Sequence, residues 1–163
     1  MRARAYVDGF NLYHGALEHR PASKWLDLRA LSQALLPHAE LDLVRYFTAR
    51  VGSADGDPGA PQRQDVYWRA LSGIDRLTIH RGKFQTETRK LSRAGTDRNE
   101  LVSVRVPEEK GSDVNLATYR RAVGADERRN IHEELLLRSQ LPDPASDEDF
   151  RTVRRPPAWE DSA

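Results

Sequence analysis

Two short segments of this sequence carry side chains that could do chemistry together. In the first, Asp8-Gly9-Phe10-Asn11, a carboxylate and a side-chain amide stand three residues apart around a glycine. At the end of a strand, such a pair can direct two oxygen-bearing groups into one cleft, and oxygen atoms are the ligands that Mg²⁺ takes. Asp and Asn are also common capping residues, so the same spacing suits caps on the helix that follows.

The second segment, residues 108–113, places three carboxylates within six residues. Glu108, Glu109 and Asp113 could form a metal cradle, and Lys110 could neutralise a phosphate or orient a carboxylate. The alternative is a solvated, charged turn in which Ser112 or Asp113 caps the next helix. Both interpretations stay open on the residue types alone.

Residues 81–105 form a basic stretch, with seven basic side chains against three acidic ones and a net charge of +4. The basic residues are Arg81, Lys83, Arg89, Lys90, Arg93, Arg98 and Arg105. With Phe84 beside them, these side chains could run along a phosphate backbone, with electrostatics supplying affinity that does not depend on sequence. An ordinary solvated β-hairpin or loop explains the same stretch.

Composition and missing motifs exclude several function classes. The chain has 163 residues, with 26 basic and 25 acidic side chains and a net charge of +1, which excludes a uniformly basic coat. It has no cysteine, so disulfides, thiol nucleophiles and thiolate metal sites are excluded. Neither GxxxxGK[ST] nor GxGxxG occurs, so a phosphate-binding loop for ATP or NAD is not supported. No stretch is apolar for long enough to be a signal peptide or a membrane span, so we expect a cytoplasmic protein without membrane contact.

The elements that must position these residues alternate between strands and helices. The patterns predict strands at 3–7, 41–48, 77–80 and 101–106, and helices at 10–19, 28–37, 62–71 and 114–123. This alternation predicts parallel βαβ units and therefore an α/β fold with an open sheet flanked by helices. Binding sites in such sheets lie at the carboxyl ends of the strands, where Asp8 and residues 108–113 are expected.

The length suits about one domain. We expect that domain over residues 1–138, shortened after about residue 123, and an extended C-terminal tail over 139–163. The tail has few apolar residues and contains Pro142, Pro144, Pro156 and Pro157, which predicts weak packing.

Two segments, AYVDGFNLYHG at 5–15 and PEEKGSDVNLATY at 107–119, together resemble the NYN domain family, the LabA-like branch of the PIN-like nucleases. The shorter segments 24–31, 44–51, 80–84 and 139–144 fit the same family, so the likeness touches most of the chain. The resemblance implies a Rossmann-like parallel sheet, an acidic site for Mg²⁺ or Mn²⁺, and cleavage of RNA phosphodiesters by metal-activated water.

The resemblance also implies roles for individual residues. Asp8 matches the first catalytic aspartate, Asn11 the amide of the same motif, and Asp113 the aspartate of the Lys-Gly-Ser-Asp motif. The implied metal ligands are Asp8 and Asp113, with Glu109 as a further candidate. The implied RNA-binding residues are Lys110, Ser112, Arg81, Lys83, Arg89 and Lys90.

One region departs from the family pattern. After the helix expected at 114–123, the family continues with an apolar strand that ends in an acidic motif, then a helix and a further strand. Residues 124–134 cannot supply these elements, because a βαβ unit takes about 30 residues or more. The sequence therefore predicts an incomplete sheet and the loss of part of the acidic site.

Three functions remain as hypotheses. The first is a metal-dependent ribonuclease of NYN type. The second is a degenerate member that binds RNA or a protein partner through the basic stretch without cleaving. The third is an interaction subunit that completes its sheet with a second copy or another chain through an exposed edge.

Overall fold

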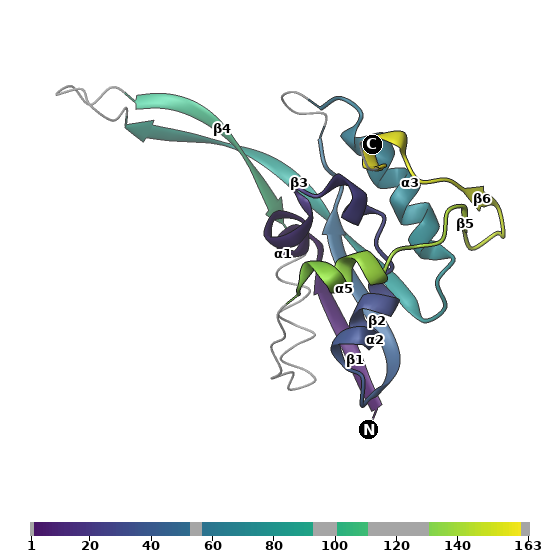
Figure 1. Ribbon diagram of the computed structural model, residues 1–163. Helices are drawn as coiled ribbons and strands as arrows, with labels where there is room; N and C mark the ends of the chain where they lie inside the picture. The colour runs from purple at the N-terminus through teal and green to yellow at the C-terminus, as the bar shows by residue number, and fades with distance from the viewer. Residues whose placement is uncertain (1, 53–56, 93–100, 111–130, 161–163) are drawn as a thin grey trace.

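The computed structural model describes residues 2–52, 57–92, 101–110 and 131–160, with 83–92 and 101–110 described by their backbone alone. Its main sheet has four strands in the order β1-β2-β3-β4. They are β1 (Arg2–Asp8), β2 (Glu40–Ala49), β3 (Leu77–Ser92) and β4 (Leu101–Lys110). The first three are parallel and flanked by helices, so the expected α/β class with an incomplete Rossmann-like sheet is confirmed (Figure 1).

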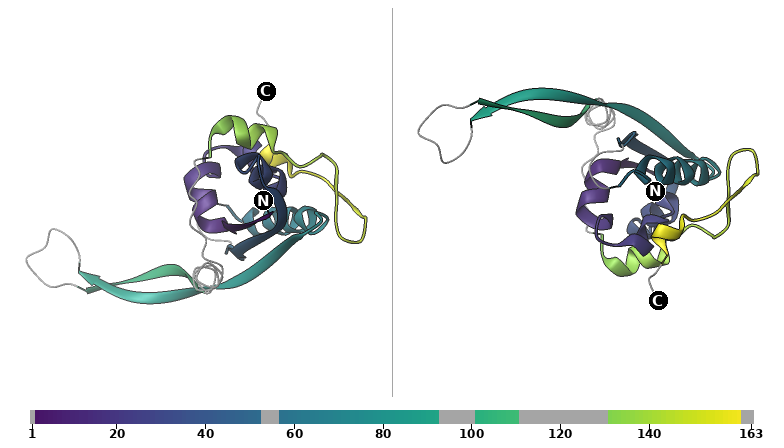
Figure 2. Two further views of the ribbon diagram at one scale, coloured as in Figure 1. Left: turned by 90° about the horizontal axis from the view of Figure 1, so that it is seen from below. Right: turned by 90° about the horizontal axis from the view of Figure 1, so that it is seen from above.

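The fourth strand differs from the expected parallel pattern. β4 runs antiparallel to β3, in a register that extends from Lys83 opposite Lys110 to Ser92 opposite Leu101. Only residues 93–100 connect the two strands, and a parallel crossover needs a dozen or more residues. β3 therefore continues past the body of the sheet and returns as a hairpin. Both views in Figure 2 show this hairpin extending beyond the packed helices.

Three helices begin within two residues of their predicted positions, the helix predicted at 114–123 lies outside the described residues, and α5 was not predicted. They are α1 (Gly9–Leu12), α2 (Leu28–Leu35), α3 (Ala60–Ser72) and α5 (Glu133–Arg138), with a π-helical turn η1 (Tyr13–Leu17) and 3₁₀ turns η2 (Pro21–Lys24) and η3 (Pro157–Trp159). Asp27 caps α2, accepting hydrogen bonds from the Arg29 and Ala30 N–H groups at 2.8 and 2.9 Å. No helix in the described part of the chain is long and apolar enough to cross a membrane.

The core forms between the helices and one face of β2. Val44 of β2 and Leu28 of α2 are fully buried, and α3 adds Leu71. Trp25 is also fully buried, in tilted contact with Tyr67 at 6.2 Å between ring centroids. The alternating apolar residues of β2 and the helical spacing of the leucines therefore meet as the patterns predict.

The C-terminal segment is packed against this core, so the prediction of a weakly packed tail was wrong. Leu141, Ala145 and Val153 are buried, and β5 (Ala145–Ser146) pairs with β6 (Thr152–Val153). The indole N–H of Trp25 donates to the Pro142 carbonyl at 3.0 Å. The segment has few apolar residues, but three of them, Leu141, Ala145 and Val153, are buried in the core.

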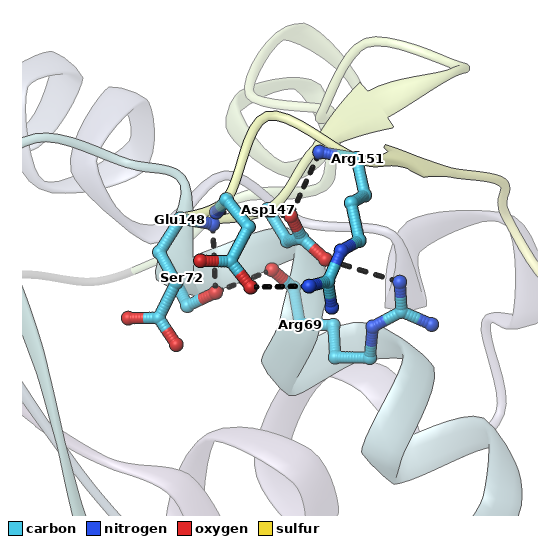
Figure 3. Close-up of polar contacts among 6 residues, drawn as sticks. Arg69, Ser72, Asp147, Glu148 and Arg151 are labelled. Carbon is cyan, nitrogen blue, oxygen red and sulfur yellow. Dashed lines mark hydrogen bonds and ion pairs between the residues drawn. The ribbon is translucent and has the colours of Figure 1, made fainter.

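A glycine and a polar network join this segment to α3. A Cβ on Gly73 would overlap the Ser146 carbonyl oxygen, so only glycine permits this approach. The buried carboxylate of Asp147 accepts a hydrogen bond from Arg69 of α3 at 3.0 Å. It also accepts from the Arg151 N–H at 2.9 Å, and Figure 3 shows both contacts. The Arg151 N–H first, and the Arg69 guanidinium after it, hold the pKa of Asp147 below its ordinary value.

Replacing Asp147 by asparagine is expected to destabilise the fold at neutral pH and not at strongly acidic pH. A carboxyl whose pKa is lowered by folding stabilises the folded state above its unfolded pKa of about 4, and this contribution is lost as the pH falls through the lowered value. In urea unfolding at several pH values, the free energy of unfolding of Asp147→Asn should be lower than that of wild type at pH 7. This difference should narrow below pH ~4 and close below the lowered pKa. The matched control is Glu148→Gln, which neutralises the neighbouring, exposed carboxylate. Its free energy of unfolding should equal that of wild type at every pH. A difference between Asp147→Asn and wild type that stays the same at acidic pH would contradict a stabilising role for the ionised Asp147 carboxylate.

Candidate functional site at the carboxyl edge of the sheet

The structure places Asp8 at the carboxyl end of β1, directly before α1. Its extended backbone (φ −83°, ψ 111°) ends the strand, and its side chain caps the helix. Oδ1 accepts from the Asn11 backbone N–H at 3.0 Å, and Oδ2 accepts from the Asn11 side-chain Nδ2 at 2.6 Å. Asp8 and Asn11 therefore form the helix cap and the carboxylate–amide pair at the same time.

Gly9 sets how closely this turn approaches the neighbouring strand. A Cβ on Gly9 would lie 2.8 Å from the Phe47 carbonyl oxygen and 2.8 Å from the Tyr46 ring. Real Cβ atoms do not come so close, and the carbonyl belongs to the β2 backbone, which cannot move aside alone. The Asp-Gly sequence thus holds the Asp8 cap against the carboxyl end of β2.

A Gly9→Ala substitution should move the Asp8 turn away from β2. Overpacking of this kind costs about 1–3 kcal/mol, so the free energy of unfolding in urea should fall by that amount. The matched control is Gly15→Ala, because nothing lies within 4 Å of a Cβ at Gly15, which is also helical. The control should be neutral or stabilise by roughly 0.5–1 kcal/mol. Equal effects of the two substitutions would contradict this role for Gly9.

A row of rings crosses the three parallel strands at the level of Asp8. Asp8 pairs with Phe47, and Phe47 pairs with His80. The Phe47 and His80 rings stack at 4.8 Å between centroids, and Tyr6 stacks on Phe47 at 6.5 Å. Sequence reasoning gave these rings no role, because the parallel register that aligns them cannot be read from any one strand.

His80 is held in its neutral form within this row. Its Nε2 lies 3.0 Å from Nη1 of Arg45, and since arginine can only donate, Nε2 accepts and Nδ1 carries the proton. Burial first, and the charge of Arg45 second, lower the pKa of His80 below its ordinary value. The row therefore places an uncharged imidazole two strands from Asp8.

The second predicted acidic segment is only partly described. Asp113 and Ser112 lie outside the described residues. Glu109 and Lys110 are at the end of β4, so β2 and β3 separate them from β1. Neighbouring strands lie about 4.8 Å apart, so the three spacings from β1 to β4 alone amount to about 14 Å. Glu109 is also displaced along the strands, because it pairs with Phe84, whereas Asp8 is level with Phe47 and His80. The sheet register therefore does not bring these two positions together.

The described part of the basic stretch belongs to the β3–β4 hairpin, which is the structure that the interpretation as a solvated β-hairpin predicted. Lys83 stands opposite Lys110 near the body of the sheet, and Arg89 and Lys90 stand further along the hairpin, opposite Val104 and Ser103. Arg81 precedes them, and its guanidinium lies over the Trp68 ring at 4.6 Å from the centroid. The hairpin backbone thus carries the basic positions outward from the carboxyl edge.

The described residues around Asp8 supply some, but not all, of the oxygen ligands that a hard divalent cation needs. Mg²⁺ is commonly held by one or two carboxylates together with waters and substrate phosphates, and Asp8 offers one such carboxylate beside the Asn11 amide. Within the described ranges, no three His, Asp or Glu side chains gather closely enough to hold a metal ion. A group of three such side chains would need a member from outside these ranges, where Asp113 lies.

Comparison with known proteins gives one informative match. No protein-family model matches the chain, and no solved structure matches it. The chain is similar to the 6-hydroxy-3-succinoylpyridine 3-monooxygenase HspA of Pseudomonas putida (strain DSM 28022 / S16), with 30% identity over 144 residues. The match covers 72% of this chain and 46% of that protein, so the chain spans about half the length of the curated relative it matches.

Proposed function

We propose that this chain is a metal-dependent ribonuclease domain of NYN type that cleaves RNA phosphodiesters. The observation that carries the proposal is the Asp8–Asn11 pair at the carboxyl end of a parallel strand, held there by the close approach of Gly9 to β2. Carboxyl ends of parallel strands are where α/β sheets bind ligands. The resemblance of residues 5–15 and 107–119 to the NYN family supports the same site.

Each residue of the site has a role in this proposal. Asp8 would hold Mg²⁺ or Mn²⁺ with one carboxylate oxygen, and Asp113 would supply a second carboxylate. Such a cation, when bound, polarises a phosphate and lowers the pKa of a bound water. Asn11 donates its amide N–H to Asp8, which fixes the carboxylate and leaves the amide oxygen to orient a water or a ribose hydroxyl.

The β3–β4 hairpin would hold the substrate strand. Arg89 and Lys90 lie on the part of the hairpin that extends from the body, and Lys83 and Lys110 lie at its base. Contacts of this kind neutralise phosphates and give affinity without sequence preference. RNA binding should therefore weaken steeply as the salt concentration rises.

A domain that binds RNA or a protein partner without cleaving is the first alternative. It is favoured by the described residues, which hold no cluster of three acidic or histidine side chains. The test is a cleavage assay on a labelled single-stranded RNA with Mn²⁺ or Mg²⁺, run on wild type, Asp8→Asn and Asp113→Asn. Cleavage that needs the metal and is lost in both variants supports the nuclease. RNA binding without cleavage by wild type supports the alternative.

A monooxygenase activity is the second candidate, favoured by the 30% identity to a protein of that name. Such an enzyme inserts one atom of O₂ into its substrate and needs a reductant for the other. Incubating the chain with 6-hydroxy-3-succinoylpyridine, O₂ and a reduced nicotinamide tests this candidate. We expect no loss of the pyridine, because the sequence has no GxGxxG phosphate-binding loop.

A further inference from the structure

Three rings stand on the surface of the helical turn that follows Asp8. The side chains of Phe10 and Tyr13 are 47% and 39% exposed, although large apolar rings are usually buried. The Phe10 and His14 ring centroids are 4.3 Å apart, and Tyr13 lies edge-on to His14 at 5.2 Å. These three side chains, here called the ring platform, form one continuous surface next to Asn11.

The outward position of the ring platform follows from the local helix geometry. Leu12 and Leu17 are the buried side chains of this segment, and they are five residues apart. In the π-helical turn η1, residues five apart lie on the same face, so Leu12 and Leu17 both point inward. The Glu18 N–H donates to the Tyr13 carbonyl at 2.8 Å, which is the bond that defines this turn. Since the leucines fix the inner face, the rings at 10, 13 and 14 must lie outside. Turns of this type occur frequently at functional sites.

Charged neighbours hold the rings in place. The Nζ of Lys24 donates to the Tyr13 hydroxyl at 3.2 Å and lies 5.0 Å from the centre of that ring. Nδ1 of His14 is 3.0 Å from a Glu18 carboxylate oxygen, and this hydrogen bond is the main cause that lowers the pKa of Glu18. The ring platform is thus fixed from both sides, with a positive charge at its edge.

We propose that the ring platform stacks unpaired nucleobases of single-stranded RNA and places the adjoining phosphate at the Asp8–Asn11 pair. This inference rests on the proposed function. Exposed aromatic rings beside a basic group are the usual means of holding single strands, because every base offers a flat π-face. A rim of polar groups at Asn11, Lys24 and Glu18 suits a hydrated nucleotide better than an apolar protein surface.

The test measures binding in EDTA, so that no cleavage can occur. The probes are a labelled single-stranded hexa-adenylate and a strand of equal length with abasic sugars. Phe10→Leu keeps an apolar side chain but removes the ring, and it should weaken hexa-adenylate binding about tenfold, in the range found for one stacked base. The abasic strand should bind wild type and variant equally. Phe10→Trp should retain affinity, with its indole fluorescence quenched when the RNA binds.

The matched control is Phe150→Leu, which makes the same change at a phenylalanine that is 92% exposed in the turn between β5 and β6. It should leave both affinities unchanged. Equal binding of hexa-adenylate by Phe10→Leu and wild type would overturn the inference while Asp8-dependent cleavage keeps the proposed function. A change from dimer to monomer in Phe10→Leu with RNA affinity unchanged would assign the rings to a contact between copies and also overturn it. Absence of both RNA binding and cleavage would overturn the inference and the proposed function together.

Discussion

Replacing Asp8 by asparagine should reduce the metal-dependent cleavage of single-stranded RNA about a hundredfold or more. A bound cation contributes several kcal/mol to the stabilisation of transition-state charge, and each 1.36 kcal/mol corresponds to about a factor of ten in rate. Asparagine keeps an oxygen that can accept from the Asn11 backbone N–H, and it is as good a helix cap as aspartate. The loss should therefore appear in the rate and not in the folded state, which circular dichroism checks.

Asp42→Asn is the matched control for this prediction. Asp42 is also a sheet carboxylate, in ion pairs with Arg2 and Arg4 at 2.7 and 3.3 Å, and it lies near the start of β2, at the opposite end of the sheet from Asp8. Its substitution should leave the cleavage rate unchanged. A folded Asp8→Asn variant that cleaves at the wild-type rate would remove Asp8 from the reaction.

The largest effect on stability is expected from Trp25→Ala. The indole is fully buried, lies against Tyr67 and Trp159, and donates to the Pro142 carbonyl. Truncation of a buried tryptophan costs about 3–5 kcal/mol, and the Pro142 carbonyl would lose its donor as well. For a chain of this size, the melting temperature should fall by about 10 °C.

Trp159→Ala is the comparison variant, because it removes a ring that packs against Trp25 and leaves the hydrogen bond from Trp25 to Pro142 in place. Trp159 contacts the same indole in a tilted arrangement, with 6.4 Å between ring centroids, but it is only partly buried, so its truncation should cost less than that of Trp25. Limited proteolysis should also cut Trp25→Ala within residues 139–160 more readily than wild type, because the C-terminal segment loses its anchor. A melting temperature equal to that of wild type would contradict the packing described for this segment.

The parallel part of the sheet could be predicted because each strand carries its own pattern. The apolar alternation over 41–48 and the short run ended by Asp8 identify β2 and β1, and helical spacing identifies α2 and α3. A β-hairpin was one interpretation of the basic stretch, but the continuation of β3 beyond residue 80 was not predicted, because polar residues dominate 83–92 and show no apolar alternation. Burial of the C-terminal segment was missed since Leu141, Ala145 and Val153 are isolated apolar residues whose partners lie far away in sequence.

At the site, sequence proximity decided what could be predicted. Asp8 and Asn11 lie within one helical turn, so their spacing already implied contact. Glu109 lies on a different strand, β4. Its separation from Asp8 depends on the order of the strands in the sheet, which no local sequence pattern reveals. The outward rings of Phe10 and Tyr13 depend on a π-helical turn, whereas a regular helix was expected there.

The measurement that tests the central claim most directly is the rate at which the wild-type chain cleaves a labelled single-stranded RNA as Mn²⁺ is titrated, with EDTA as the reference. We predict cleavage that rises with Mn²⁺ to a plateau, stops in EDTA, and is about a hundredfold or more slower in Asp8→Asn at every Mn²⁺ concentration. Cleavage that persists in EDTA, or a folded wild-type chain that leaves the RNA intact throughout the titration, would contradict a metal-dependent nuclease site at the carboxyl edge of the sheet.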